Sequence, residues 1–131
     1  MGFFALTFLN VKSFSFFNMN KLDFNNKTFS LITNSKNGEV DTETVFEYSQ
    51  KGNLVTAEYH GGNIRYGKII SVLKSNELHM RYQCITTDDE LKAGKAIAEI
   101  SLNEQGKIKL KLNWEWLGGN QTIGTSEYIE N

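Results

Sequence analysis

The sequence predicts an all-β fold: a single-domain antiparallel up-and-down meander of about eight strands that closes into a small barrel. Three observations predict it. The segment 107–117 alternates apolar and polar residues without interruption, similar segments follow one another from about Lys27 onward, and the turns between them contain glycine or asparagine. Proline, which cannot donate to a β-ladder, is absent from all 131 residues.

The segment 107–117 is the clearest strand. One parity carries apolar side chains and the other carries polar or charged ones, which is the two-residue period of a strand with one buried and one solvated face. We expect the apolar set to face the core. It comprises Ile108, Leu110, Leu112, Trp114 and Trp116.

The turns place the other strands. Glycine and asparagine accept the positive φ that tight hairpins require, so each cluster of them marks a connection. The predicted strands are Lys27–Thr33, Glu43–Gln50, Leu54–His60, Asn63–Lys74, Glu77–Thr86, Leu91–Leu102, Lys107–Leu117 and Gln121–Ile129. The segment 88–98 could form a turn or two of helix at most.

Closure follows from the number of strands. A long meander leaves two exposed edges unless its first strand pairs with its last. We therefore expect a closed or nearly closed barrel of the lipocalin or avidin-like kind, with a two-sheet sandwich as the alternative. Gly67 and Gly94 stand inside long predicted strands, where we expect a bulge or a sharp bend.

Composition limits the partners. A net charge of −1 with interspersed signs offers no basic surface for nucleic acid and no polybasic membrane patch, so we expect neither partner. Cys84 is the only cysteine, which excludes an intrachain disulfide and fits a cytoplasmic, reducing compartment. We interpret Cys84 as a packing residue rather than a nucleophile.

The first eighteen residues differ from the rest, because they are rich in phenylalanine and contain no acidic residue. Lys12 follows the apolar run instead of preceding it, which argues against a secretory signal, and the run is too short to span a bilayer. We expect residues 1–18 to be a disordered or misassigned extension, with translation beginning at Met19 and one β-barrel domain over residues 19–131.

A ligand site is expected at one end of the barrel. Alternate connections of a meander lie at the same end of the barrel. One end collects the longer and more polar connections, which are 34–42, 60–63, 86–90 and 118–120. Function on barrels tends to lie in such loops. The predicted ligand-binding residues are Trp116, Trp114, Arg81, Tyr82, Tyr59 and His60.

Two alternatives remain open for this site. The aromatic side chains have enough volume to fill a small barrel completely. Arg81 shares its parity with His79, which favours a solvated outer face; in the lumen, its guanidinium could instead bind a carboxylate or a phosphate. We expect Glu58, Glu99 and Glu115 to point outward.

No catalytic residue, metal site or cofactor is expected. His60 and His79 are the only histidines, and no carboxylates complete a zinc site around them. The acidic run 88–90 lacks the glycine and the alternating ligands of a calcium loop, so we interpret it as a solvated turn.

A set of turn glycines and strand aromatics resembles a known family. It comprises Asn37-Gly38-Glu39, Phe46-Glu47-Tyr48, the run 59–64, Gly67, Arg81-Tyr82, the run 90–95, Trp114-Glu115-Trp116 and Gly124-Thr125-Ser126. Together these residues are similar to a family of short bacterial proteins often labelled n-acetylglutamate synthase. The label implies acetyl transfer from acetyl-CoA to glutamate. The common fold of such transferases needs a glycine-rich loop that opens a helix, and the turn at Gly52 precedes no predicted helix, so we interpret the label as a naming error.

Three functions remain as hypotheses. The first is a cytoplasmic barrel that binds a small anionic or aromatic molecule. The second is a structural or protein-interaction barrel with a filled core, for which a homodimer is the expected assembly. The third is the acetyl-CoA-dependent N-acetyltransferase that the label implies.

Overall fold

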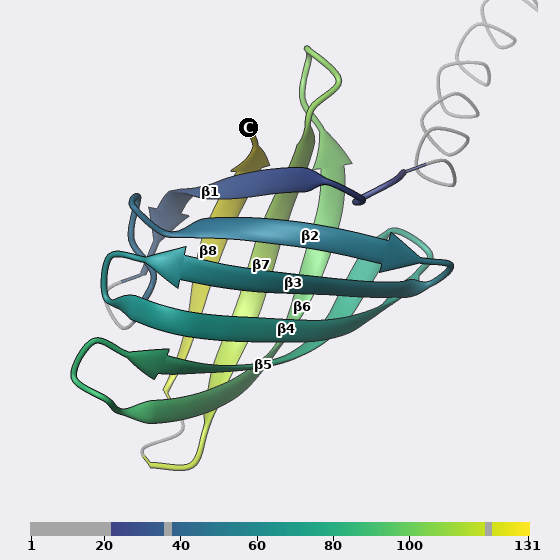
Figure 1. Cartoon of the computed structure of the whole chain (residues 1–131). Coiled ribbons are helices and arrows are strands. Elements are labelled where there is room, and N and C mark those ends of the chain that lie inside the picture. Colours follow the sequence, from purple (N-terminus) through teal and green to yellow (C-terminus); the bar gives the residue numbers. More distant parts are fainter. Residues whose placement is uncertain (1–21, 36–37, 120–121) are drawn as a thin grey trace, which may run out of the picture.

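The protein is a closed eight-stranded antiparallel barrel in which each strand pairs with its neighbours in sequence order (Figure 1). The structure is a computed structural model that describes residues 22–35, 38–119 and 122–131. The predicted extension 1–18 lies outside the described residues. Within them, no helix has the length and apolar character needed to cross a membrane.

The predicted strands agree closely with the observed ones. The bounds are β1 Lys27–Asn34, β2 Val45–Lys51, β3 Leu54–Gly61, β4 Ile64–Lys74, β5 Glu77–Thr86, β6 Leu91–Leu102, β7 Ile108–Leu117 and β8 Ile123–Glu130. The segment 88–98 forms a turn and the start of β6, without a helical turn, because its two-residue alternation prevails. The barrel is closed, so the sandwich alternative is wrong.

Closure depends on β1, which pairs with β8 as well as with β2. Phe29 lies opposite Phe46 on one side and opposite Glu130 on the other. The pairing with β2 covers only residues 27–30 of β1, whereas the pairing with β8 continues to Asn34. The ladder between β1 and β2 therefore ends at the Ser30–Val45 pair, and the rest of β1 pairs with β8 alone.

Register shifts occur close to one of the two glycines that the sequence indicated. They lie between Leu31 and Thr33 and in the facing ends of β3 and β4, directly beside the Tyr59–Gly67 pair. The ladders around Gly94 contain no shift, so no bulge forms there. Aromatic rings in the lumen contact the bare backbone of both glycines, as described below.

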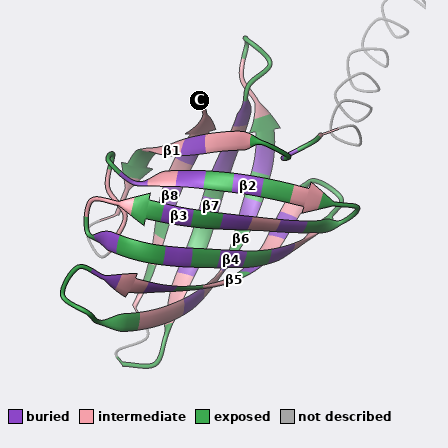
Figure 2. Cartoon of the chain, viewed as in Figure 1, coloured by how far each residue is buried: buried purple, intermediate pink, exposed green. Residues whose placement is uncertain are grey.

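The interior is filled by residues that alternate with more exposed ones along most of the strands, as Figure 2 shows by burial. All five apolar residues predicted for the segment 107–117 face inward, and four of them are buried. Small and large residues are paired on the adjacent strands β6 and β7, where Ala96 pairs with Trp114 and Ala98 with Leu112. A small partner leaves room in a narrow lumen for the large side chain beside it.

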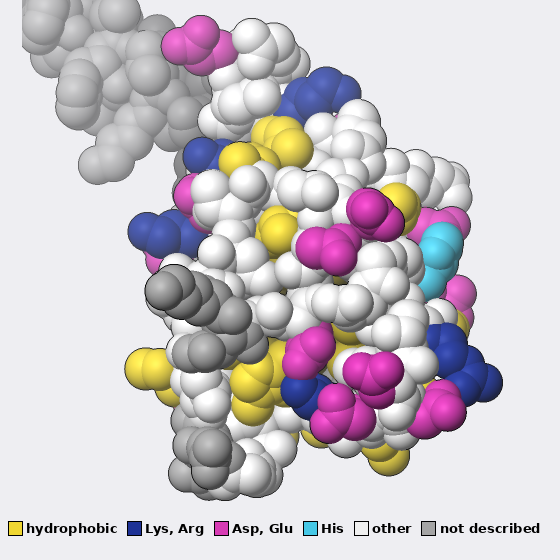
Figure 3. All heavy atoms as spheres, turned by 90° about the vertical axis from the view of Figure 1, so that its left-hand side faces the viewer, with side chains coloured by type: hydrophobic (Ala, Val, Ile, Leu, Met, Phe, Trp, Pro, Cys, Tyr) yellow, Lys and Arg dark blue, Asp and Glu magenta, His cyan; other side chains and the backbone are white. Residues whose placement is uncertain are grey.

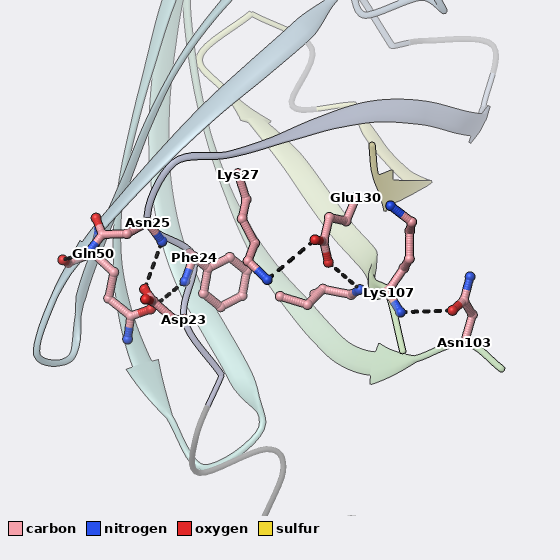
Figure 4. Close-up of polar contacts among 9 residues, drawn as sticks. Asp23, Phe24, Asn25, Lys27, Gln50, Asn103, Lys107 and Glu130 are labelled. Atoms are coloured by element: carbon pink, nitrogen blue, oxygen red, sulfur yellow. Dashed lines mark hydrogen bonds and ion pairs between the residues drawn. The ribbon is translucent and has the colours of Figure 1, made fainter. Parts of the chain in front are cut away.

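Residues before β1 close one end of the barrel. Phe24 is fully buried, with its ring centroid 6.0 Å from that of Phe29 and 5.6 Å from that of Tyr48. Asn25 fixes the segment to the end of β2, since its Oδ1 accepts a hydrogen bond from Gln50 N (2.7 Å) and its Nδ2 donates to Gln50 O (2.9 Å) (Figure 4). Phe24 therefore serves as a plug at this end.

Glu130 links the strands that meet at the seam. Its carboxylate lies 3.3 Å from Lys27 Nζ on β1 and accepts a hydrogen bond from Ile108 N on β7 (2.9 Å), as Figure 4 shows. This side chain of β8 therefore contacts both neighbouring strands and supports the closure.

Candidate functional site

The open end of the barrel, opposite the Phe24 plug, gathers the predicted set of longer connections. Thr87 N donates to Asn63 O (2.9 Å), which joins the β5–β6 and β3–β4 connections, and Ser35 N donates to Thr125 O (3.0 Å) on β8. We call this end the mouth. Figure 3 shows it with Asp and Glu side chains gathered around hydrophobic ones.

A pocket opens into the lumen at the mouth. Aromatic rings form its wall, and the β1–β2 connection forms part of its rim. The aromatic residues are Phe46, Tyr59, Tyr82, Trp114, Trp116 and Tyr128, and the rim includes Asn34, Glu39 and Val40. The free space between these side chains is only about 40 Å³, enough for a water molecule or two. The lumen beneath this mouth pocket is packed, as the filled-core alternative expected.

Glycines make room for the rings of the mouth pocket. A Cβ atom on Gly94 would lie 2.5 Å from Tyr82 Cζ and Oη, so the Tyr82 ring covers the bare backbone of the next strand. That ring contacts Trp116 edge to face, with centroids 5.7 Å apart. Gly67 stands in the same way beneath the ring of Tyr59, and Gly124 beneath Trp114. The absence of side chains at these positions therefore shapes the wall.

We expect Gly94→Ala to destabilise the barrel by about 1–3 kcal/mol, because the methyl group would force the Tyr82 ring away from its position. Tryptophan emission should change as well, since Tyr82 contacts Trp116. Chemical denaturation followed by tryptophan fluorescence measures both effects. The double variant Gly94→Ala/Tyr82→Leu, which lacks the clashing ring, should recover part of the loss; equal stability of the two variants would show that the ring is not the cause.

Asn34 places an unsatisfied acceptor at the rim of the pocket. Its Nδ2 donates to Val40 O (2.9 Å), which holds the β1–β2 connection against the end of β1. Its Oδ1 is buried and has no hydrogen-bond partner within the described structure. A buried acceptor without a donor costs about 1–3 kcal/mol, so this atom is a local cost to the stability of the fold.

Lys92 lies next to the mouth pocket, against two of the residues that line it. It forms an ion pair with Glu39 of the β1–β2 connection, and its Nζ lies 5.5 Å from the centroid of the Trp116 ring. The hydrogen bond with Glu39 raises the pKa of Lys92, and the nearby charges of Glu39 and Glu90 act in the same direction. The ammonium group therefore remains charged where it lies over the aromatic wall.

Cys84 and Tyr59 lie side by side in the wall. Cys84 is buried, as predicted, and burial is the main cause that raises the pKa of its thiol. Burial likewise raises the pKa of the Tyr59 phenol, with a smaller effect from Cys84. A protonated thiol is a poor nucleophile, which agrees with a packing role.

Four of the six predicted ligand-binding residues come together in the mouth pocket: Tyr59, Tyr82, Trp114 and Trp116. The other two lie on the outer wall. His60 is exposed and approaches Glu47 (3.4 Å), and Arg81 is exposed with its Nη1 donating to Met80 O (3.3 Å). The hypothesis that Arg81 faces the lumen is therefore wrong, because its parity on β5 points outward.

Sequence reasoning missed the polar residues of the site. Lys92 could have been found, since it shares its parity with the inward-facing Gly94, Ala96 and Ala98 of β6. Glu39 carries no comparable signal, because it lies in an irregular connection and meets Lys92 across fifty-three positions of sequence. The predicted outward positions of Glu58, Glu99 and Glu115 agree with their exposed or half-exposed side chains.

The arrangement suits recognition of a small molecule. Rings offer flat apolar contact, and the Glu39 carboxylate offers an acceptor that fixes an orientation. Among the residues that the structure describes, no group of three or more His, Cys, Asp or Glu could hold a metal ion.

Comparisons with known proteins give one match. A sequence model of the family described as Avidin-like protein matches residues 22–131, which include Phe24 and all eight strands. No curated protein matches, and neither does any solved structure.

Proposed function

Because the chain belongs to the avidin-like protein family, we propose that it is a small-molecule-binding barrel whose ligand occupies the mouth pocket. The observation that carries this proposal is the wall of aromatic rings at the mouth, with Asn34 and Glu39 beside it. An apolar ligand with one hydrogen-bond donor would stack on Trp116 and Tyr82 and donate to the Glu39 carboxylate. The single cysteine favours a cytoplasmic location for this activity.

Ligand entry requires the rim to move, because the free space of about 40 Å³ is far smaller than a typical ligand site. Glu39 and Val40 are the suitable moving part. They belong to the β1–β2 connection, which is held at the mouth by the Lys92 ion pair and the Asn34 hydrogen bond. Displacement of this rim leaves the strands of the barrel paired.

The full chain, purified without denaturation, tests the proposal by native mass spectrometry and by tryptophan fluorescence with added biotin as the first probe. We expect a bound small molecule or a probe that quenches emission. Trp116→Ala should weaken binding about tenfold or more, since it removes an aromatic wall of the pocket. Arg81→Ala on the outer wall is the matched control and should bind as the wild type does. Equal binding by the Trp116 and Arg81 variants would contradict the proposal.

The second candidate function, an interaction barrel, is favoured by apolar side chains on the outer wall. Ile70, Ile97 and Ile123 are exposed to 59%, 41% and 69% on strands β4, β6 and β8. A persistent dimer in sedimentation, together with the absence of any bound molecule or quenching, would support this candidate over the first. Acetyl-CoA belongs in the same titration, because quenching by it alone would support the N-acetyltransferase alternative.

A further inference from the structure

Lys92 is an unusual residue on the lumen face. The later inward positions of β6 are Gly94, Ala96, Ala98 and Ile100, all small or apolar. Lys92 continues this parity to the mouth, where its ammonium group meets the Glu39 carboxylate and the face of Trp116. A carboxylate and an indole face are the two kinds of group that recognise organic cations in proteins. The side chain therefore occupies a cation site.

The charges around the mouth favour a cation over an anion. The four connections at this end contain six carboxylates against one lysine, Lys36, which lies outside the described residues. The carboxylates are Glu39, Asp41, Glu43, Asp88, Asp89 and Glu90. Next to them, Arg65 is paired with Asp89 (2.7 Å) and Lys92 with Glu39. A concave site surrounded by one sign of charge concentrates ligands of the opposite sign.

The charged group of the pocket wall beside Lys92 is also an acceptor. The Glu39 carboxylate would need a donor as soon as Lys92 left it. An ammonium group with N–H donors can supply one, whereas a carboxylate would meet a like charge.

The geometry points to an organic cation, a primary ammonium group on an aromatic or alicyclic body, as the ligand class of the mouth pocket, with Lys92 as its built-in competitor. This inference rests on the proposed function and specifies it. The ligand's ammonium group takes the place of Lys92 Nζ between Glu39 and Trp116, and the ring lies against Tyr82 and Trp114. No covalent step is involved.

Three probes of similar shape and different charge test the inference: benzylammonium, benzyl alcohol and benzoate. Each is titrated into the full chain and into Lys92→Ala, with binding measured by tryptophan fluorescence and calorimetry. We expect benzylammonium to bind most tightly, and its affinity to rise about tenfold in Lys92→Ala, because the competing ammonium group is gone. Lys95→Ala, on the outer face of the same strand, is the matched control and should match the wild type.

Glu39→Gln in the Lys92→Ala background should remove the preference for benzylammonium, since the carboxylate partner of the ligand is lost. Tighter binding of benzoate than of benzylammonium, or equal benzylammonium affinity in the Lys92→Ala and Lys95→Ala variants, would overturn the inference. Equal binding of all three probes would overturn the preference for an organic cation but would still support a small-molecule pocket. No binding of any probe to either protein would overturn the inference, while ligands of other classes found by native mass spectrometry would still support the pocket.

Discussion

Phe24→Ala is expected to lower the free energy of unfolding by about 3–5 kcal/mol, the range for removing a large aromatic side chain from a core. Phe24 is fully buried, and its ring packs against both Phe29 and Tyr48, which contact each other, at the closed end of the barrel. Truncation would remove one ring of this three-ring cluster and leave a cavity. Chemical denaturation monitored by circular dichroism measures the loss.

Leu91→Ala is the matched control for this variant. Leu91 is 75% exposed at the start of β6, so its truncation should change stability by no more than about 0.5 kcal/mol. If Phe24→Ala costs less than about 1 kcal/mol, the segment before β1 does not contribute to the core as described. The same result would remove residues 22–26 from the folded unit.

Alkaline pH is expected to destabilise the barrel steeply above about pH 10. Burial raises the pKa of Tyr48, Tyr59 and Tyr128, in the case of Tyr128 to about 12. These phenols keep their protons in the folded barrel but ionise near pH 10 in the unfolded chain, so above that pH the unfolded state binds fewer protons. Their contribution is fully present below pH 10 and is lost as the pH rises towards their folded values.

The expected slope is about 1.4 kcal/mol per pH unit for each buried tyrosine, or roughly 4 kcal/mol per unit for the three together. Guanidinium unfolding at about pH 8 and about pH 11 measures it. Phenolate absorbance should show Tyr66, which is exposed, ionising before the cooperative transition. Tyr48→Phe should reduce the dependence of unfolding free energy on pH by about one third, because it removes one of the three buried phenols. Tyr66→Phe removes an exposed phenol and should leave that dependence unchanged. A stability that does not change between the two pH values would contradict the buried positions of these phenols.

The strands and their facing were predictable from the sequence because they depend on local patterns. The alternation in 107–117 places Trp114 and Trp116 in the lumen, and the same rule places Lys92 there once β6 is recognised. The turn residues Asn76 and Asn103 and the polar run 87–90 placed the ends of β5 and β6 at the observed residues. The parity of Arg81 likewise indicated its outward position. The alternative that its guanidinium binds a ligand in the lumen was wrong.

The sequence by itself determined an all-β meander, the inward set of the strand in 107–117, and four aromatic residues of the mouth pocket. Only the tertiary structure decided which polar groups join them, because Glu39 and Lys92 meet through barrel closure and an irregular connection that has no periodic signal. The tertiary structure also decided the role of Phe24 and the reason for Gly94, since a plug and a ring over bare backbone are properties of packing between distant strands. Local backbone preference sets the strands, whereas the contents of the lumen depend on which side chains closure brings together.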